Sequence, residues 1–123
     1  MTAFTFQTTR SVIVEPGGSR KLGTLMADLG CTNVLLVSDS GIMGLGLAAP
    51  AIDGFSDANV NLSIFADVIA DPPEEVILSA VSDAKAKNVD GVVGLGGGSS
   101  MDVAKLLALL LGSDQKLSDM YGI

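Results

Sequence analysis

The sequence predicts an α/β fold in which a mainly parallel sheet is covered by helices on both faces. Short apolar runs bounded by polar residues alternate with helical patterns through most of the chain. The apolar residues are mostly Val, Leu, Ile and Ala, with only 4% aromatic residues and no Trp, which suits buried parallel strands. A length of 123 residues allows one domain of modest size and is too short for two.

Two extended segments and a helix are expected at the start of the chain. The extended segments cover residues 4–7 and 11–15, and Pro16-Gly17-Gly18 ends the second one as a turn. A helix is predicted from Ser19 or Arg20 to Leu29, with Gly30 as its C-terminal stop. Its inward face is expected to consist of Leu22, Leu25, Met26 and Leu29.

Two buried strands are expected next, separated by a glycine-rich connection. The continuous apolar run NVLLVS predicts a strand over residues 33–38, and a second strand is predicted over 60–65. Glycines and a proline interrupt any helical pattern after the first strand, so only a short helix from about Leu47 onward is expected between them.

The last part of the chain predicts a helix, a strand and a further helix. The segment DPPE offers Asp71 as a carboxylate N-cap, prolines in the first turn and a glutamate three places after the cap. This helix is expected to run to about Asn88, and a strand over 91–95 and a helix over 100–111 follow. The inward residues of the first helix are expected to be Val76, Ile77, Ala80, Val81 and Ala84.

Charge and residue usage exclude several classes of function. The formal net charge of −7, with no compensating basic run, argues against nucleic acid as a partner. The single Cys31 cannot form an internal disulfide or a cysteine cluster for zinc, and the absence of His removes Ser-His-Asp catalysis and the usual imidazole metal sites. No apolar run approaches membrane-spanning length, so we expect a cytoplasmic protein that does not contact membranes.

The stretch GVVGLGGGSSMDVAK, residues 91–105, carries the strongest functional signal. Ligands of open parallel sheets bind beyond the carboxyl ends of the strands, and Gly96-Gly97-Gly98-Ser99 lies between a predicted strand and a predicted helix. Glycines allow an anion to approach the backbone, and the N–H groups and positive dipole end of a helix face that anion. The segment therefore predicts a diphosphate site, although it matches neither GxxxxGK[ST] nor a strict GxGxxG.

The same residues also have structural explanations. Three glycines between a strand and a helix can serve only to make a tight and closely packed turn. Ser99 and Asp102 fit a capping box in which Ser99 is the N-cap. Asp39, at the end of a predicted strand, is a common type of turn former, and Lys105 fits a solvated helix position as well as one that faces a cleft.

The order of NVLLVSDSGI, VIADPP and DGVVGLGGGSSMDVAK resembles the N-terminal domain of the iron-containing (group III) alcohol dehydrogenases. The resemblance covers residues 9–111 and implies a Rossmann-like sheet, as the truncated N-terminal domain of a dehydroquinate synthase-like fold. Two positions depart from the family pattern: Asp71 stands where asparagine is frequent, and PGG replaces the usual phenylalanine-glycine-x-glycine turn.

The resemblance implies roles for individual residues. Gly97–Ser99 would wrap the diphosphate of NAD(P), with Gly96 in the turn. Asp39 would face the adenosine ribose and favour NAD over NADP, because a carboxylate accepts hydrogen bonds from the 2′- and 3′-hydroxyls and repels a 2′-phosphate. Asp102 matches the aspartate at the helix start near the cofactor cleft, and Lys105 matches the lysine that follows it.

The function implied by the resemblance is hydride transfer between an alcohol and the nicotinamide of NAD(P). Family enzymes bind Fe²⁺ or Zn²⁺ through an aspartate and histidines of a helical C-terminal domain. Because this chain has no His, residues 1–123 are expected to form an incomplete cofactor-binding domain, without catalytic residues and inactive alone. A homodimer or larger assembly is expected through exposed strand edges. The alternative is a stand-alone, non-catalytic module that binds a nucleotide or assembles with itself.

Overall fold

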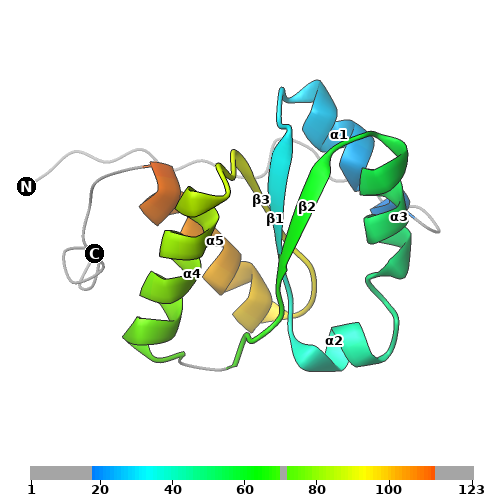
Figure 1. The fold of residues 1–123 in the computed structure, drawn as a ribbon. Helices are drawn as coiled ribbons and strands as arrows, with labels where there is room; N and C mark the ends of the chain where they lie inside the picture. Colours follow the sequence, from blue (N-terminus) through cyan, green and yellow to red (C-terminus); the bar gives the residue numbers. More distant parts are fainter. Residues whose placement is uncertain (1–17, 70–71, 113–123) are drawn as a thin grey trace, which may run out of the picture.

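The computed structural model describes residues 18–69 and 72–112, and all structural statements refer to these ranges. They form a three-stranded parallel sheet with helices on both faces (Figure 1). The strands are β1 (Asn33–Val37), β2 (Asn61–Phe65) and β3 (Gly91–Gly94), in the order β2-β1-β3. The predicted fold class and all three strands expected in this part of the chain are confirmed, each within one residue at either end.

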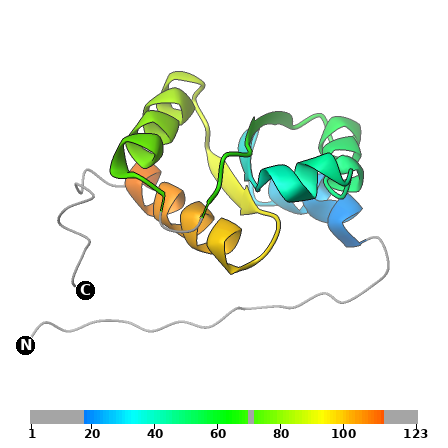
Figure 2. The ribbon, with the colours of Figure 1, turned by 90° about the horizontal axis from the view of Figure 1, so that it is seen from below.

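The helices form two groups on opposite sides of the sheet. They are preceded by a 3₁₀ turn, η1 (Gly18–Lys21), and consist of α1 (Leu22–Asp28), α2 (Ser40–Gly44), α3 (Ala49–Asp57), α4 (Glu74–Ala86) and α5 (Gly98–Gly112). The side of the sheet with α1 and α3 is separated by the strands from the side with α4 and α5 (Figure 2). No helix in the described ranges is long and apolar enough to cross a membrane.

Strand β1 divides the interior into two cores. Successive side chains of a strand point to opposite faces, so Val34 and Leu36 pack with Phe55 on the side of α3. Leu35 and Val37 pack with the side chains of α4 and α5 on the other face. These four apolar residues of β1 are all buried, which explains why the central strand is encoded as a continuous apolar run rather than as an alternating one.

The chain turns in opposite directions on leaving β1 and β3. After β1 it passes through α2 and α3 to β2, and after β3 it enters α5 on the opposite face of the sheet. The last pair in register is Val37 with Gly94, so the carboxyl ends of β1 and β3 lie next to each other. Such a reversal is the point at which doubly wound sheets open a crevice beyond the strand ends.

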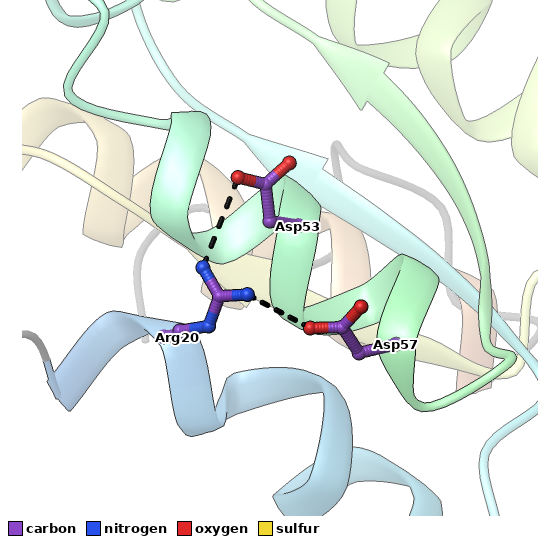
Figure 3. A network of polar contacts seen from close by, with 3 residues as sticks. All are labelled: Arg20, Asp53 and Asp57. Atoms are coloured by element: carbon purple, nitrogen blue, oxygen red, sulfur yellow. Dashed lines mark hydrogen bonds and ion pairs between the residues drawn. The ribbon is translucent and has the colours of Figure 1, made fainter.

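Helices α1 and α3 approach each other through glycines. A Cβ atom at Gly23 would overlap the backbone of Gly54, and one at Gly54 would overlap the carbonyl group of Arg20. Arg20 also forms ion pairs with Asp57 (Nη2 to Oδ2, 2.9 Å) and Asp53 (Nη1 to Oδ2, 3.9 Å), as Figure 3 shows. These pairs are exposed and stabilise little, so the close approach depends on the glycines.

The first helix differs from the prediction in the face that it buries. Leu22 and Met26 pack against the core as expected, but Leu25 is 39% exposed and Leu29 is 77% exposed. The buried residue of α1 is Gly23, because the backbone of α3 lies against it. The apolar spacing did not reveal this contact, since a glycine contributes no apolar side chain to the pattern.

The start of α4 also differs from the prediction. The N-cap is Pro73, in an extended conformation and without a side-chain cap, so α4 begins at Glu74 and not next to Asp71. The reason is that a residue before proline disfavours the α conformation, and Pro72 precedes Pro73. The helix ends at Ala86 instead of Asn88, and four of the five expected inward residues are buried: Ile77, Ala80, Val81 and Ala84.

Further differences concern the connection after β1 and the start of α5. Two helices, α2 and α3, replace the single short helix expected from about Leu47, and α5 begins at Gly98, two residues before the expected position. The predicted extended segments 4–7 and 11–15, Pro16 and Gly17 of the predicted turn, and Asp71 lie outside the described residues.

Candidate functional site

The carboxyl ends of β1 and β3 are joined by two hydrogen bonds. The N–H of Leu95 donates to the carbonyl of Val37 at 2.9 Å, and the hydroxyl of the fully buried Ser38 donates to the carbonyl of Leu95 at 2.7 Å. The next residue on each side is Asp39 after β1 and Gly96 after β3. The fold therefore brings together the predicted ribose acceptor and the beginning of the predicted diphosphate loop.

Asp39 is the N-cap of α2. The N–H of Ile42 donates to its Oδ1 at 2.8 Å, with the Asp39 backbone extended at φ −114° and ψ 164°. The cap explains why α2 forms among glycines, and it gives Asp39 a structural role as a helix cap rather than as a turn former. That role accounts for one carboxylate oxygen. The other oxygen, Oδ2, faces the glycine loop, where the hydroxyl of Ser100 donates to it at 3.5 Å.

The glycines of the loop are of two kinds. A Cβ atom at Gly94 would lie 3.0 Å from Ala104 Cβ, so this glycine allows β3 and α5 to pack closely. Gly96 has φ +139°, a conformation that side chains rarely adopt, and its Cβ would lie 3.0 Å from Ser100 Oγ. At Gly97 and Gly98, by contrast, a Cβ atom would have no described atom within 4 Å apart from its chain neighbours and the backbone of its own helix. Packing explains the first two glycines but not the last two.

Helix α5 begins within the loop. The N–H of Met101 donates to the carbonyl of Gly97 at 3.1 Å, which places Gly97 at the N-cap position and Ser99 inside the first turn. The expected capping box with Ser99 as N-cap is therefore wrong, because the glycines themselves enter the helix. The first N–H groups of an α-helix have no intrahelical acceptor, and Gly98 and Ser99 are exposed. They are available to an anion at the positive end of the helix dipole.

Asp102 and Lys105 lie on exposed positions of α5, about one and two turns after its start. Within the described ranges neither side chain forms a hydrogen bond or ion pair with Asp39 or with Gly96–Ser99. The solvated position considered for Lys105 agrees with its exposure. A cofactor contact of Asp102 stays a prediction.

Ser100 lies next to the predicted site but was not among the residues predicted from the sequence. It is 1% exposed and belongs to the buried face of α5, whose other members are Val103, Ala104, Leu107 and Leu110. A signal existed in the sequence, because Ser100 is the only polar residue in this helical spacing. A buried hydroxyl among aliphatic residues indicates a specific hydrogen-bond acceptor.

The amino end of the sheet carries a second polar cluster. The backbone N–H groups of Thr32 and Asn33 donate to the Asp90 carboxylate at 2.9–3.1 Å, and the Thr32 hydroxyl adds a bond of 3.0 Å. The backbone bonds from Thr32 and then Asn33 hold the pKa of Asp90 below its ordinary value. Burial, and secondly the Asp90 charge, raise the pKa of Cys31, which favours its thiol form.

Acidic and sulfur ligands do not gather into a metal site in the described part of the chain. No group of three or more His, Cys, Asp or Glu side chains there is arranged to hold a metal ion. The described residues therefore do not fit an iron or zinc centre, and no chemical step of a metal is assigned to them.

The chain forms a doubly wound α/β protein. Its sheet has the order β2-β1-β3, helices cover both faces of the sheet, and a glycine loop lies where the chain leaves β1 and β3 toward opposite faces. The chain belongs to the iron-containing alcohol dehydrogenase family, since the family model with that description matches residues 9–123. The resemblance inferred from the sequence motifs is thereby confirmed.

Relatives within this family match the chain over only part of their own length. An NAD-dependent methanol dehydrogenase of Bacillus methanolicus is 27% identical over 90% of this chain and 29% of the relative. A choline dehydrogenase of Bacillus subtilis is 36% identical over 76% of this chain and 23% of the relative. The crystal structure of NADH-dependent butanol dehydrogenase A from Thermotoga maritima superposes with a TM-score of 0.85 at 25% identity, covering 98% of this chain and 31% of that protein.

Proposed function

We propose that this chain is the N-terminal, cofactor-binding portion of an NAD-dependent alcohol dehydrogenase. The diphosphate of NAD would bind at Gly97, Gly98 and Ser99, and the adenosine ribose at Asp39. The observation that carries the proposal is the open space at Gly97 and Gly98. No described contact requires a glycine at either position, so the missing side chains leave room for a molecule that approaches the backbone.

Each residue would contribute a different part of the binding. The N–H groups at the start of α5 would donate to the diphosphate oxygens, helped by the dipole of a helix of 15 residues. Gly96 lets the chain turn from β3 into α5, as its φ of +139° requires. Asp39 Oδ2 would accept from a ribose hydroxyl, since only Oδ1 is engaged in capping α2. When bound, the nicotinamide accepts or donates the hydride.

Two considerations favour NAD over NADP. A carboxylate at Asp39 would repel a 2′-phosphate, and two of the similar proteins are named as NAD-dependent or NADH-dependent dehydrogenases. We expect no alcohol oxidation by the 123-residue chain alone, with or without added Fe²⁺ or Zn²⁺. NADH formation that survives repurification of the chain would contradict this expectation.

Titration of the chain with ADP-ribose, followed by two-dimensional NMR, tests the proposal. Gly98→Val places a branched side chain in the space assigned to the diphosphate, and we expect at least tenfold weaker binding, as for loss of about 1.4 kcal/mol. Gly112→Val is the matched control, because Gly112 is also open and lies at the other end of α5. Equal binding by wild type and Gly98→Val, or no binding by folded wild type, would contradict the proposal.

A further inference from the structure

We propose that Ser100 is a positioning residue that orients the Asp39 carboxylate toward the 2′-hydroxyl of the adenosine ribose. The inference rests on the proposed function, in which Asp39 accepts from the ribose, and it adds a residue that determines how well this acceptor works. Ser100 itself would not touch the cofactor, because it is 1% exposed.

Ser100 is buried in an apolar environment. Its neighbours on the buried face of α5 are aliphatic, and removing a hydroxyl from water without a partner is unfavourable. The partner in the structure is Asp39 Oδ2, at 3.5 Å from Ser100 Oγ. This distance is long for a hydrogen bond, so we attribute to the contact a role in orientation more than in stability.

The Asp39 carboxylate is held from two sides. Oδ1 accepts from the Ile42 N–H of α2 at 2.8 Å, and Oδ2 accepts from Ser100 of α5. Two contacts from different helices restrict rotation of the carboxylate about its side-chain bonds. Because a carboxylate oxygen can accept more than one hydrogen bond, Oδ2 can still accept one from a hydroxyl group of a ligand.

Gly96 allows this contact to form. A Cβ atom at Gly96 would lie 3.0 Å from Ser100 Oγ and 3.3 Å from Asp39 Oδ2, close to both groups. The same glycine begins the loop assigned to the diphosphate. Ser100 therefore connects the orientation of the ribose acceptor to the helix that would bind the diphosphate.

A comparison of ADP with 2′-deoxy-ADP isolates the role of Ser100. We expect the 123-residue chain to bind ADP about tenfold more tightly than 2′-deoxy-ADP, as for one hydrogen bond to a charged group. In Ser100→Ala this ratio should fall to about threefold or less, because the carboxylate is no longer held toward the hydroxyl. A purely structural role would weaken both ligands equally and leave the ratio unchanged.

Two further variants complete the experiment. Ser38→Ala removes another buried hydroxyl at the same strand ends, one that bonds to Leu95 and not to Asp39, so the tenfold ratio should be retained. Ser100→Cys keeps the shape of the side chain but replaces the hydroxyl with a somewhat larger and weaker donor, and an intermediate ratio is expected. NMR spectra of each variant report whether it is folded.

The outcomes separate this inference from the proposed function. An unchanged ratio in Ser100→Ala, or an equal fall in Ser38→Ala, would overturn the role of Ser100 while the diphosphate site stands. If wild type binds ADP and 2′-deoxy-ADP equally, the ribose role of Asp39 is lost together with that of Ser100. If folded wild type binds neither, the proposed function fails as well.

Discussion

The two ends of the sheet each combine an aspartate with glycine, but they use these residues differently. At the amino end, the Asp90 carboxylate accepts bonds from both Thr32 and Asn33. The neighbouring Gly91 is covered, since a Cβ atom there would lie 2.7 Å from Met26 Cε and 2.8 Å from Cys31 Sγ. The polar groups at this end are occupied by the chain itself.

The carboxyl end leaves part of its polar surface unoccupied by described residues. Asp39 has one oxygen in a helix cap and the other in a long contact with Ser100. Gly97 and Gly98 face open space at the start of α5. Residue type therefore does not distinguish a structural aspartate or glycine from one that is available to a ligand. The distinction depends on whether contacts within the chain already occupy the carboxylate oxygens and the space beside the glycine.

Replacement of Asp39 is expected to have the largest effect on ligand preference. Asp39→Ser should raise the affinity for ADP-ribose 2′-phosphate at least tenfold relative to the affinity for unphosphorylated ADP-ribose. The reason is that the carboxylate that repels the 2′-phosphate is removed. Serine is preferred to glycine here since it can still cap α2. Asp90→Ser is the control and should leave the ratio unchanged. The affinities are measured by NMR titration. An unchanged ratio in Asp39→Ser would mean that Asp39 only caps α2 and does not select the ligand.

Removal of the Asp90 charge should destabilise the fold in a pH-dependent way. The pKa of Asp90 is lowered in the folded chain by the backbone bonds from Thr32 and Asn33. Its charge therefore stabilises the fold above the ordinary aspartate pKa, and this contribution is lost as the pH falls through the lower, folded value. Asp90→Asn should reduce the free energy of unfolding by about 1 kcal/mol or less at pH 7. The effect is small because Asp90 is exposed and solvent screens its charge.

Urea unfolding at pH 7 and at about pH 3 checks this expectation. The difference between wild type and Asp90→Asn should be present at the higher pH and smaller at the lower one. A difference of the same size at both pH values would show that the carboxylate charge is not what stabilises the amino end.

The same glycine-to-alanine change should have opposite signs at the two ends. Gly91→Ala is expected to lower the free energy of unfolding by about 1 kcal/mol, because Met26 and Cys31 must shift to accept the Cβ atom. Gly98→Ala should raise it by up to about 0.5 kcal/mol, since alanine favours a helix and meets no neighbour. Denaturant unfolding of both variants is the test. Destabilisation by both would mean that Gly98 is also required for folding.

The edge strands of the sheet form a third surface, and a change there is expected to have the smallest effect of those described. Within the described residues β2 and β3 each pair only with β1, and Ile64 on β2 is 44% exposed. We expect self-association through these edges, strengthened by salt because the net charge of −7 opposes it. Sedimentation velocity at low and high salt should show a shift toward dimer that Ile64→Lys reduces. A monomer under both conditions would contradict the expectation.

The sequence by itself determined the fold class and the places of the strands. A strand buried on both faces must be apolar at consecutive positions, so NVLLVS was recognisable, and β1 covers residues Asn33–Val37 of it. The glycine loop was placed correctly after the last strand for a similar reason, because its composition departs locally from both strand and helix patterns. Buried helix positions such as Ile77 and Ala80 followed from spacing alone.

Only the tertiary structure decided which polar groups and glycines are already occupied. Asp39 and Ser100 are 61 residues apart in the chain, and no local pattern contains the distance between them. Likewise, the atoms that cover Gly91 come from Met26 and Cys31, and the backbone that covers Gly23 comes from α3. Local patterns encode exposure and backbone preference, whereas contacts between distant segments arise only when the elements pack, and these contacts separate structural residues from those left for a ligand.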